Sequence, residues 1–422
     1  MRILISGASV AGPALAYWLT RYGFSVTVVE RAPALRKTGG HAIDLFRPAM
    51  DIVEQMGVLE RVRAKKTGTQ WLTMFREGER RPVELELSRV MSAVSDRHVE
   101  IMRDDLSEIF YDATRDDVDY VFGDSIASIS DGDGGGEGAE GAEVRFDSGR
   151  TEHFDLVVGA DGLHSNVRRL VFGPESLFTT WIGAYLAVAS VPNHLGLDGR
   201  MEGIAGVGRM AGMYGAAHLD DARAVFLFRT PEPLDYHHRD VARQKELLRA
   251  RFDGLGWEVP RLMAELDRTP AFYFDSITQL RLDTWSRGRV TLVGDAGYCP
   301  GPAVGGSTSL AVVGAYVLAG ELAAHGGDHT RAFPSYEAEI GDYVRRGRTF
   351  AIGAAKRLVP GARFDLWALT QGVRLINHLP VALTKAATKI SSKGVRLHDS
   401  IALKDYSAFT VAAARQGRTS RP

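Results

Sequence analysis

Three short segments of the chain place an acidic side chain close to glycine, after an apolar run that is typical of a buried strand. The first spans Gly7–Gly12 and is followed by Glu30, the second begins at Asp161, and the third begins at Gly294. Because ligands of open parallel sheets bind beyond the carboxyl ends of the strands, acids at such positions face a common crevice. Carboxylates accept hydrogen bonds from sugar hydroxyls, and glycine leaves backbone amides accessible. The three segments therefore predict a nucleotide-like ligand.

The first segment is a G-x-S-x-x-G variant of the dinucleotide-binding fingerprint. Gly7 permits the tight turn after the strand, and Gly12 permits close packing of the helix on the sheet. Ser9 replaces the middle glycine, although its hydroxyl can donate to a phosphate. Glu30 follows 18 residues after Gly12, where a carboxylate would bind ribose hydroxyls and disfavour a 2′-phosphate. The segment predicts FAD or NAD binding, with a ligand-free turn as the alternative.

The third segment adds a requirement that few ligands meet. Asp295 repels a phosphate but accepts hydrogen bonds from sugar hydroxyls. The glycine-rich stretch after it leaves bare amides around Val304–Gly306, just before a helix expected from Ser307, and such amides bind an anion or a carbonyl oxygen. FAD has both a polyol and an electron-rich ring. The third segment therefore favours FAD over other nucleotides.

The second segment, Asp161–Arg168, is less specific. It follows a strand expected at 156–158, so Asp161 could face the ligand crevice. Asp161 or Ser165 could equally cap the next helix. The sequence leaves both interpretations open.

Two kinds of sheet alternate along the chain. Parallel-type strands are expected at 3–5, 25–29, 156–158 and 290–293, whereas residues 181–230 alternate in the manner of antiparallel strands. The predicted fold class is α/β, with a Rossmann-like FAD-binding domain, an interleaved antiparallel-sheet substrate domain and a C-terminal helical segment. The expected ranges are 1–73, 98–176 and 275–335 for the FAD-binding domain, 74–97 and 177–274 for the substrate domain, and 336–422 for C-terminal helices that bridge the domains, with a tail.

Composition excludes several classes of protein. The net charge of −1 argues against a nucleic-acid binder, which would carry a basic surface. The single cysteine, Cys299, allows no internal disulfide and fits a reducing, cytoplasmic location. The uncharged run at 307–320 is too short to span a bilayer and is expected to form a buried helix rather than a membrane anchor. No metal site and no nucleophilic triad are predicted.

The order of the three segments resembles the class A flavin-dependent aromatic monooxygenases, which have the para-hydroxybenzoate hydroxylase fold. Within that family the chain is most similar to the tetracycline-inactivating branch, over roughly residues 1–325. The resemblance implies that Arg103 contacts the FAD pyrophosphate and ribityl region, that Asp44 is a flavin-side acid, and that Arg36 contacts the nicotinamide cofactor. The full set of cofactor-binding residues that we expect is Gly7, Ser9, Ala11, Gly12, Glu30, Arg31, Arg36, Asp44, Arg103, Asp161, Asp295, Pro302, Gly305 and Gly306.

Two positions depart from the family pattern. Tyr298 stands where the family commonly has histidine, and Gly305–Thr308 stands where it has G-x-G-x-N. The dipeptide of Gly305 and Gly306 keeps the bare amides. We therefore expect FAD binding to survive these changes better than hydroxylation does.

The resemblance also implies a reaction. NADPH or NADH reduces FAD, dioxygen adds to give a flavin C4a-hydroperoxide, and an oxygen atom passes to an aromatic or polyketide-like small molecule, as in antibiotic modification or secondary metabolism. Spacing singles out no catalytic base among His41, His98, Tyr214 and Tyr298. The candidate substrate contacts are His41, Met213, Tyr214 and Tyr298, with the glycine- and methionine-rich segment 203–219 as either a cavity wall or an ordinary sheet.

Two further hypotheses stay open, a flavoprotein whose FAD is mainly structural, as in a cyclase-type pocket, and a non-catalytic nucleotide-binding module. The sequence leaves the oligomeric state at monomer or homodimer.

Overall fold

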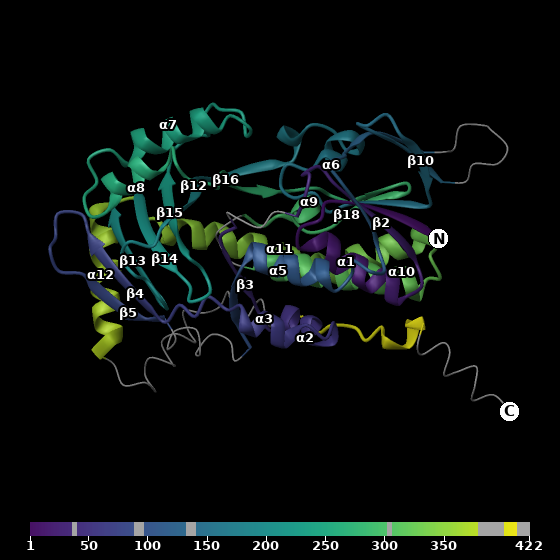
Figure 1. Cartoon of the computed structure of the whole chain (residues 1–422), viewed down its shortest axis with the longest axis horizontal. Coiled ribbons are helices and arrows are strands. Elements are labelled where there is room, and N and C mark those ends of the chain that lie inside the picture. The colour runs from purple at the N-terminus through teal and green to yellow at the C-terminus, as the bar shows by residue number, and fades with distance from the viewer. Residues whose placement is uncertain (36–39, 88–96, 132–140, 302–305, 379–400, 412–422) are drawn as a thin grey trace.

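The computed structural model of the chain describes residues 1–35, 40–87, 97–131, 141–301, 306–378 and 401–411. Three expected cofactor-binding residues, Arg36, Pro302 and Gly305, lie outside these ranges. The described elements form two large sheets, which occupy opposite ends of the long axis of the molecule (Figure 1).

The first sheet has six strands in the order β17-β18-β11-β1-β2-β7. Its central strands are parallel, and only β17 pairs in the antiparallel sense. Parallel sheets are covered on both faces, so their strands are apolar throughout. The strands are β1 (Arg2–Ser6), β2 (Ser25–Glu30), β7 (Asp119–Phe122), β11 (Leu156–Gly159), β17 (Ser286–Arg287) and β18 (Val290–Leu292).

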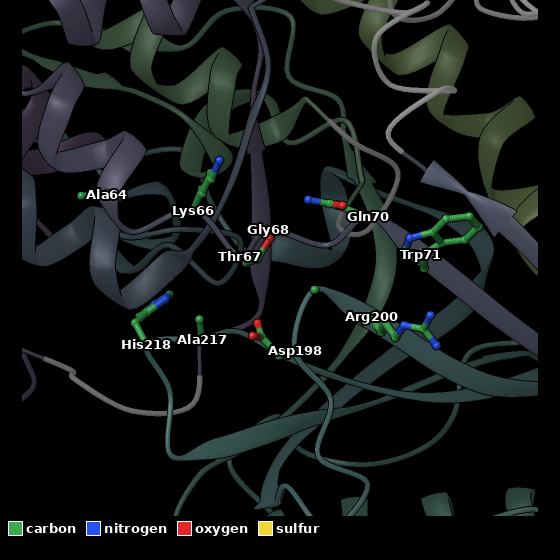
Figure 2. A pocket seen from close by; sticks show the side chains of 11 residues that line it. Ala64, Lys66, Thr67, Gly68, Gln70, Trp71, Asp198, Arg200, Ala217 and His218 are labelled. Atoms are coloured by element: carbon green, nitrogen blue, oxygen red, sulfur yellow. The ribbon is translucent and has the colours of Figure 1, made fainter. Parts of the chain in front are cut away.

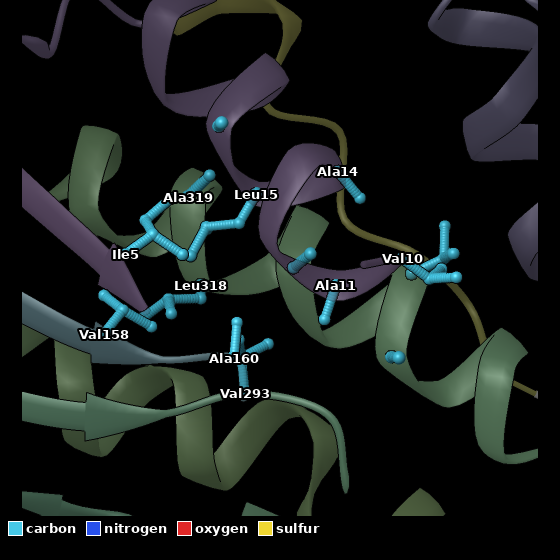
Figure 3. Packing of buried hydrophobic residues seen from close by; sticks show 14 of the residues in the cluster. Ile5, Val10, Ala11, Ala14, Leu15, Val158, Ala160, Val293, Leu318 and Ala319 are labelled. Carbon is cyan, nitrogen blue, oxygen red and sulfur yellow. The ribbon is translucent and has the colours of Figure 1, made fainter. Parts of the chain in front are cut away.

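Three helices begin at or beside residues expected to bind the cofactor. They are α1 (Ala11–Arg21), which starts within the first segment, α5 (Arg103–Asp112), which starts at Arg103, and α10 (Ser307–Ala324), which follows the third segment. Helix α10 packs on α1 and is apolar enough, by length and composition, to cross a membrane, yet most of its residues are buried inside the fold. The expectation of a buried helix is therefore confirmed. The core between β1, β11, α1 and α10 is formed by small and branched side chains (Figure 3).

The second sheet has seven strands in the order β16-β12-β15-β14-β13-β4-β5 and is antiparallel except where β13 meets β4. One face packs on α7 (Val241–Phe252) and α8 (Val259–Glu265), and the other contacts α11 (His329–Leu358), which also packs on α10. The strands are β4 (Trp71–Arg76), β5 (Val83–Glu86), β12 (Thr179–Pro192), β13 (Arg200–Gly206), β14 (Arg209–Gly215), β15 (Asp221–Arg229) and β16 (Phe272–Leu280).

Smaller elements complete the fold. A three-stranded sheet is formed by β8 (Ile126–Asp131), β9 (Ala142–Phe146) and β10 (Thr151–Phe154), and a two-stranded sheet by β3 (Ala42–Leu45) and β6 (Val99–Met102). The remaining helices are α2 (Arg47–Gln55), α3 (Leu59–Ala64), α6 (Asn166–Val171), α9 (Asp295–Tyr298) and α12 (Arg363–His378), with 3-10 turns at Glu175–Leu177 and Ser407–Phe409.

The α/β fold class is confirmed. The domain ranges stay a prediction, and two strands of the seven-stranded sheet cross their limits. Strand β4 begins at Trp71, before the expected boundary at 74, and β16 runs from Phe272 across the expected boundary at 275.

Candidate functional site

The ends of three parallel strands bring the three acidic segments to one edge of the six-stranded sheet. Ser6 lies opposite Gly159, and Gly159 lies opposite Leu292, so β1, β11 and β18 end level with one another. The next residues continue the pairing, since the Ala160 amide donates to the Ser6 carbonyl at 2.8 Å and the Val293 amide donates to the Gly159 carbonyl at 2.9 Å. The turns that follow these strands therefore share a single edge.

Glycine is required at the first turn for two separate reasons. Gly7 has φ of 110°, and a Cβ there would lie 2.6 Å from the Ala160 carbonyl oxygen. A Cβ on Gly12 would lie 1.9 Å from the Gly7 carbonyl oxygen. Gly294 has φ of 68° and lies close to Ala11. A Cβ added to Gly294 would lie 3.3 Å from the Ala11 Cβ. The first and third segments thus meet at the start of α1 (Figure 3).

Glu30 is held at the end of β2 by two backbone amides. Its Oε2 accepts from the Ala8 amide at 2.9 Å, and its Oε1 accepts from the Ala32 amide at 2.8 Å. Each carboxylate oxygen can accept more than one hydrogen bond, so the group keeps capacity for ribose hydroxyls. The adjacent Arg31 is exposed.

Arg103 lies over the N-terminal end of α1. Its Nε and Nη2 both donate to Ser9 Oγ, at 3.3 and 3.2 Å, and its own amide donates to the His41 carbonyl. Among the residues that the structure describes, no carboxylate pairs with this guanidinium. An arginine without an acidic partner beside a helix N-terminus suits a pyrophosphate, because both groups favour negative charge. The residues present therefore fit FAD at this edge.

Asp161 has its own local role. Its Oδ2 accepts from the amides of Asn166 at 2.9 Å and Val167 at 3.1 Å, its Oδ1 accepts from Ser165 Oγ, and Ser165 in turn caps α6 by accepting from the Arg168 amide. Burial raises the pKa of Asp161, while these hydrogen bonds favour its charged form. The capping interpretation of both residues is thus supported, and a ligand contact by Asp161 stays a prediction.

Asp295 begins α9 and accepts from Ser307 Oγ at 2.6 Å, which links it to the start of α10. The residue before α10, Gly306, has φ of 85°, a conformation that favours glycine, and makes no side-chain cap. A carboxylate and an uncapped helix N-terminus therefore lie together, as expected for a ribityl chain and a ring carbonyl.

Arg168 connects the second segment to the third, which sequence reasoning missed. Its guanidinium donates to the Ala296 carbonyl in α9 at 2.9 Å and to Glu175 at 2.7 Å, and the side chain is fully buried. Nothing local in the sequence shows that this arginine reaches α9, because Ala296 lies 128 residues further along the chain.

Asp44 lies on β3, the strand expected beside the flavin. Its Oδ1 is 2.6 Å from His98 Nε2, and its carbonyl accepts from Ser309 Oγ of α10 at 3.1 Å. Glu100 stands directly opposite Asp44 in the β3–β6 pair, and burial, followed by the charge of Asp44, raises the pKa of Glu100. Ser309 and Glu100 were not predicted, since only the packing of α10 on β3 and the pairing of β3 with β6 bring them here.

Two candidate substrate contacts gather where the start of β3 meets the seven-stranded sheet. The His41 ring lies 5.4 Å from the ring of Tyr273 on β16, and the Ala42 amide donates to the Tyr214 hydroxyl at 2.7 Å. Burial, reinforced by the charge of Arg103, lowers the pKa of His41 to about 4, so the imidazole is neutral at pH 7. Tyr273 was not predicted and joins this group through strand β16.

Met213 and Tyr298 lie elsewhere. Met213 is the strand neighbour of Tyr214, so its side chain faces the core under α7 and α8. Tyr298 is fully buried between Trp285 and Tyr336, and its hydroxyl accepts from the Tyr336 hydroxyl at 3.0 Å. The structure does not bring either residue together with His41 and Tyr214.

Comparison with known proteins shows the family to which the chain belongs. The model of the FAD binding domain family matches residues 1–202. A flavin-dependent monooxygenase of Legionella longbeachae is 37% identical over 83% of this chain and 88% of that protein, and an uncharacterised protein of Mycobacterium tuberculosis is 44% identical over 82% and 91%. The crystal structure of tetracycline destructase Tet(51) superposes with a TM-score of 0.80 at 33% identity, covering 96% of this chain and 98% of that one. The chain therefore belongs to the flavin-dependent monooxygenases and carries their FAD-binding domain.

Proposed function

We propose that this protein hydroxylates an aromatic or polycyclic, polyketide-like small molecule with dioxygen, using FAD that NADPH or NADH reduces. The observation that carries the proposal is the gathering of Gly7, Arg103, Asp161 and Asp295 at one sheet edge. Bound FAD supplies the activation of oxygen, and the protein supplies binding, orientation and exclusion of water.

The chain's own residues divide this work. The Arg103 guanidinium and the N-terminus of α1 balance the pyrophosphate charge, Glu30 accepts from the ribose, and Asp295 accepts from the ribityl hydroxyls. The amides at the start of α10 would donate to a carbonyl oxygen of the ring and would stabilise the negative charge that this oxygen gains on reduction. On the basis of the family resemblance, the proposal also includes cofactor contacts by Asp44, Arg31, Arg36, Pro302 and Gly305.

The substrate side is formed by the face of the seven-stranded sheet that Tyr214 shares with an apolar cluster containing Leu186, Val188 and Ile277. An apolar wall with few polar groups suits a polycyclic ring system and excludes water from the reaction. The relative Tet(51) is named a tetracycline destructase, which supports a polycyclic substrate. We also propose a cytoplasmic location, because the free thiol of Cys299 and the need for NADPH or NADH fit a reducing compartment.

One assay tests the redox proposal. Purified protein should be yellow and should oxidise NADPH or NADH with consumption of oxygen, faster in the presence of a substrate found by screening polycyclic phenols. Yellow protein without such turnover would indicate FAD with a structural role, and colourless protein that takes up no FAD would indicate a bare nucleotide-binding module.

A matched pair of variants tests the site. Asp295→Ala should lose FAD on dilution about tenfold more readily than wild type, because a charged acceptor for the ribityl hydroxyls is removed. Tyr298→Phe should retain FAD, since that hydroxyl bonds to Tyr336 inside the core. Equal retention in the two variants would contradict the assignment of Asp295.

A further inference from the structure

A cavity of about 470 Å³ lies apart from the residues that gather at the strand ends (Figure 2). It is bounded by the connection from α3 to β4, by the start of β13, and by the turn between β14 and β15. The side chains that matter for its chemistry are Lys66, Thr67, Trp71, Asp198, Arg200 and His218. None of the predicted FAD or substrate contacts lines it.

The wall of this cavity is formed by backbone segments that are hydrogen-bonded to one another. The Gln70 amide donates to the Gly199 carbonyl at 2.8 Å, and Trp71 pairs with Arg200 at the start of the β4–β13 ladder. Gly199 has φ of 62°, and a Cβ there would lie 3.1 Å from the Gly68 carbonyl oxygen. Two glycines therefore let the connection and the start of β13 approach closely and hold the opening in one shape.

The lining carries an excess of positive charge. Lys66 and Arg200 pair with no carboxylate among the residues that the structure describes, and Asp198 is the acid that lines the cavity. His218 is 2.8 Å from Asp105, a carboxylate that Lys65 also approaches at 3.2 Å, so the charge of Asp105 is already balanced outside the lining. Two cations against one acid favour an anionic ligand.

The cavity also offers a ring surface. Trp71 is half-buried at its edge, on the same side as Arg200 (Figure 2). Indole faces bind planar rings by stacking, while ammonium and guanidinium groups bind carboxylates and phosphates. We propose that this cavity is a second binding site, for a small aromatic molecule that bears one anionic group, separate from the site at the strand ends.

The position of the cavity gives such a ligand a route to the flavin side. Thr67 donates to Glu100, and Glu100 stands opposite Asp44 of β3. A ligand that reorients Thr67 therefore acts on the strand that carries the flavin-side acid.

Salicylate is a direct probe, since it carries one carboxylate on a planar ring. Isothermal titration of the FAD-loaded enzyme should show one salicylate bound per chain at this site. Arg200→Met should weaken binding about fivefold, the effect expected of one partly exposed ion pair. Lys66→Met should weaken it less, because Lys66 lies across the opening from Trp71 and Arg200 (Figure 2). Arg239→Met is the matched control, because it removes an exposed positive charge outside the lining, and it should leave the affinity unchanged.

Two analogues separate the contributions of charge and ring. Cyclohexanecarboxylate, which keeps the charge but not the aromatic ring, and 2-hydroxybenzyl alcohol, which keeps the ring but not the charge, should both bind more weakly than salicylate. FAD retention should be the same in all three variants, so this test fails or succeeds independently of the proposed hydroxylation.

Three results would overturn the proposal. Equal salicylate affinity in the Lys66, Arg200 and Arg239 variants would place the ligand elsewhere, for example beside the flavin. An uncharged analogue that binds as well as salicylate would remove the role of the cations. Competition between salicylate and NADPH, with the same two variants losing NADPH affinity, would make the cavity a dinucleotide site instead.

Discussion

The two large sheets differ in how they place functional residues. At the edge of the six-stranded sheet, the backbone determines the arrangement, since parallel strands that end level must bring their following turns together. On the seven-stranded sheet, side-chain alternation determines it, so Met213 and Tyr214 are neighbours in sequence yet point to opposite faces. A cofactor that many relatives share can depend on the first kind of site. At the second kind of site, a single side-chain substitution changes the contacts offered to a ligand, so such a site suits a variable substrate.

The largest test of this contrast is a glycine substitution in each region. Gly12→Ala should destabilise the protein by about 3 kcal/mol and abolish FAD retention, because its Cβ would lie 1.9 Å from the Gly7 carbonyl oxygen and only backbone could move. Gly256→Ala, between α7 and α8, is the matched control. It meets no atom within 4 Å and should change stability by no more than about 0.5 kcal/mol.

Thermal unfolding followed by circular dichroism, together with the absorbance of retained FAD, measures both variants. A Gly12→Ala protein that unfolds at the wild-type temperature and stays yellow would show that the backbone does not fix this edge of the sheet.

The sequence predicts the first region well because its signals are local. Gly7 and Gly12 are needed for backbone conformation and close approach, and both needs are visible in the fingerprint itself. Arg168 and Ser309 were missed for the opposite reason. Each joins elements more than 100 residues apart, Arg168 to Ala296 and Ser309 to Asp44, and no spacing along the chain encodes such a contact.

For the candidate substrate contacts, the prediction from sequence failed for different reasons. Grouping Met213 with Tyr214 as joint substrate contacts overlooks the alternation of a strand, which the pattern of residues 209–215 already carries. Tyr298 was considered because it replaces a family histidine, yet a short helix after Asp295 turns it into the core. Alternation was readable from the sequence, whereas the direction of a four-residue helix was not.

An intermediate effect is expected on the seven-stranded sheet. Tyr214→Phe removes the acceptor of the Ala42 amide at the start of β3 and should cost about 1–2 kcal/mol. Since β3 carries Asp44, FAD affinity should also fall, by about fivefold. Met213→Leu keeps the volume of a core side chain and should cost less than about 1.5 kcal/mol, with FAD affinity unchanged.

Fluorescence titration of the apoprotein with FAD, beside thermal unfolding, distinguishes the two faces. If Met213→Leu lowered FAD affinity as much as Tyr214→Phe did, the two faces of the sheet would not be functionally separate, and the contrast between the regions would weaken.

At neutral pH the smallest effect should come from His41, which joins the two regions through its carbonyl bond to Arg103 and its ring contact with Tyr273. Its pKa is about 4 in the folded protein, below the value of about 6.5 in an unfolded chain. Between these values the unfolded chain binds more protons, so stability is complete above about pH 6.5 and falls as the pH drops towards 4. At pH 5 the loss should be about 2 kcal/mol.

His41→Gln cannot titrate and should lose less stability than wild type between pH 7.5 and pH 5, as measured by urea unfolding. His237→Gln, at an exposed position, is the control and should follow wild type at both pH values. Burial and Arg103 together lower the pKa of His41. When Arg103→Met is introduced into both the wild-type and the His41→Gln proteins, their losses of stability on acidification should therefore differ by less than before. Some difference should remain, because burial still lowers the pKa. Equal losses of stability in the His41→Gln and wild-type proteins would mean that the His41 ring is solvated. The contact between the start of β3 and the seven-stranded sheet would then be open to water, whereas the proposed hydroxylation requires water to be excluded there.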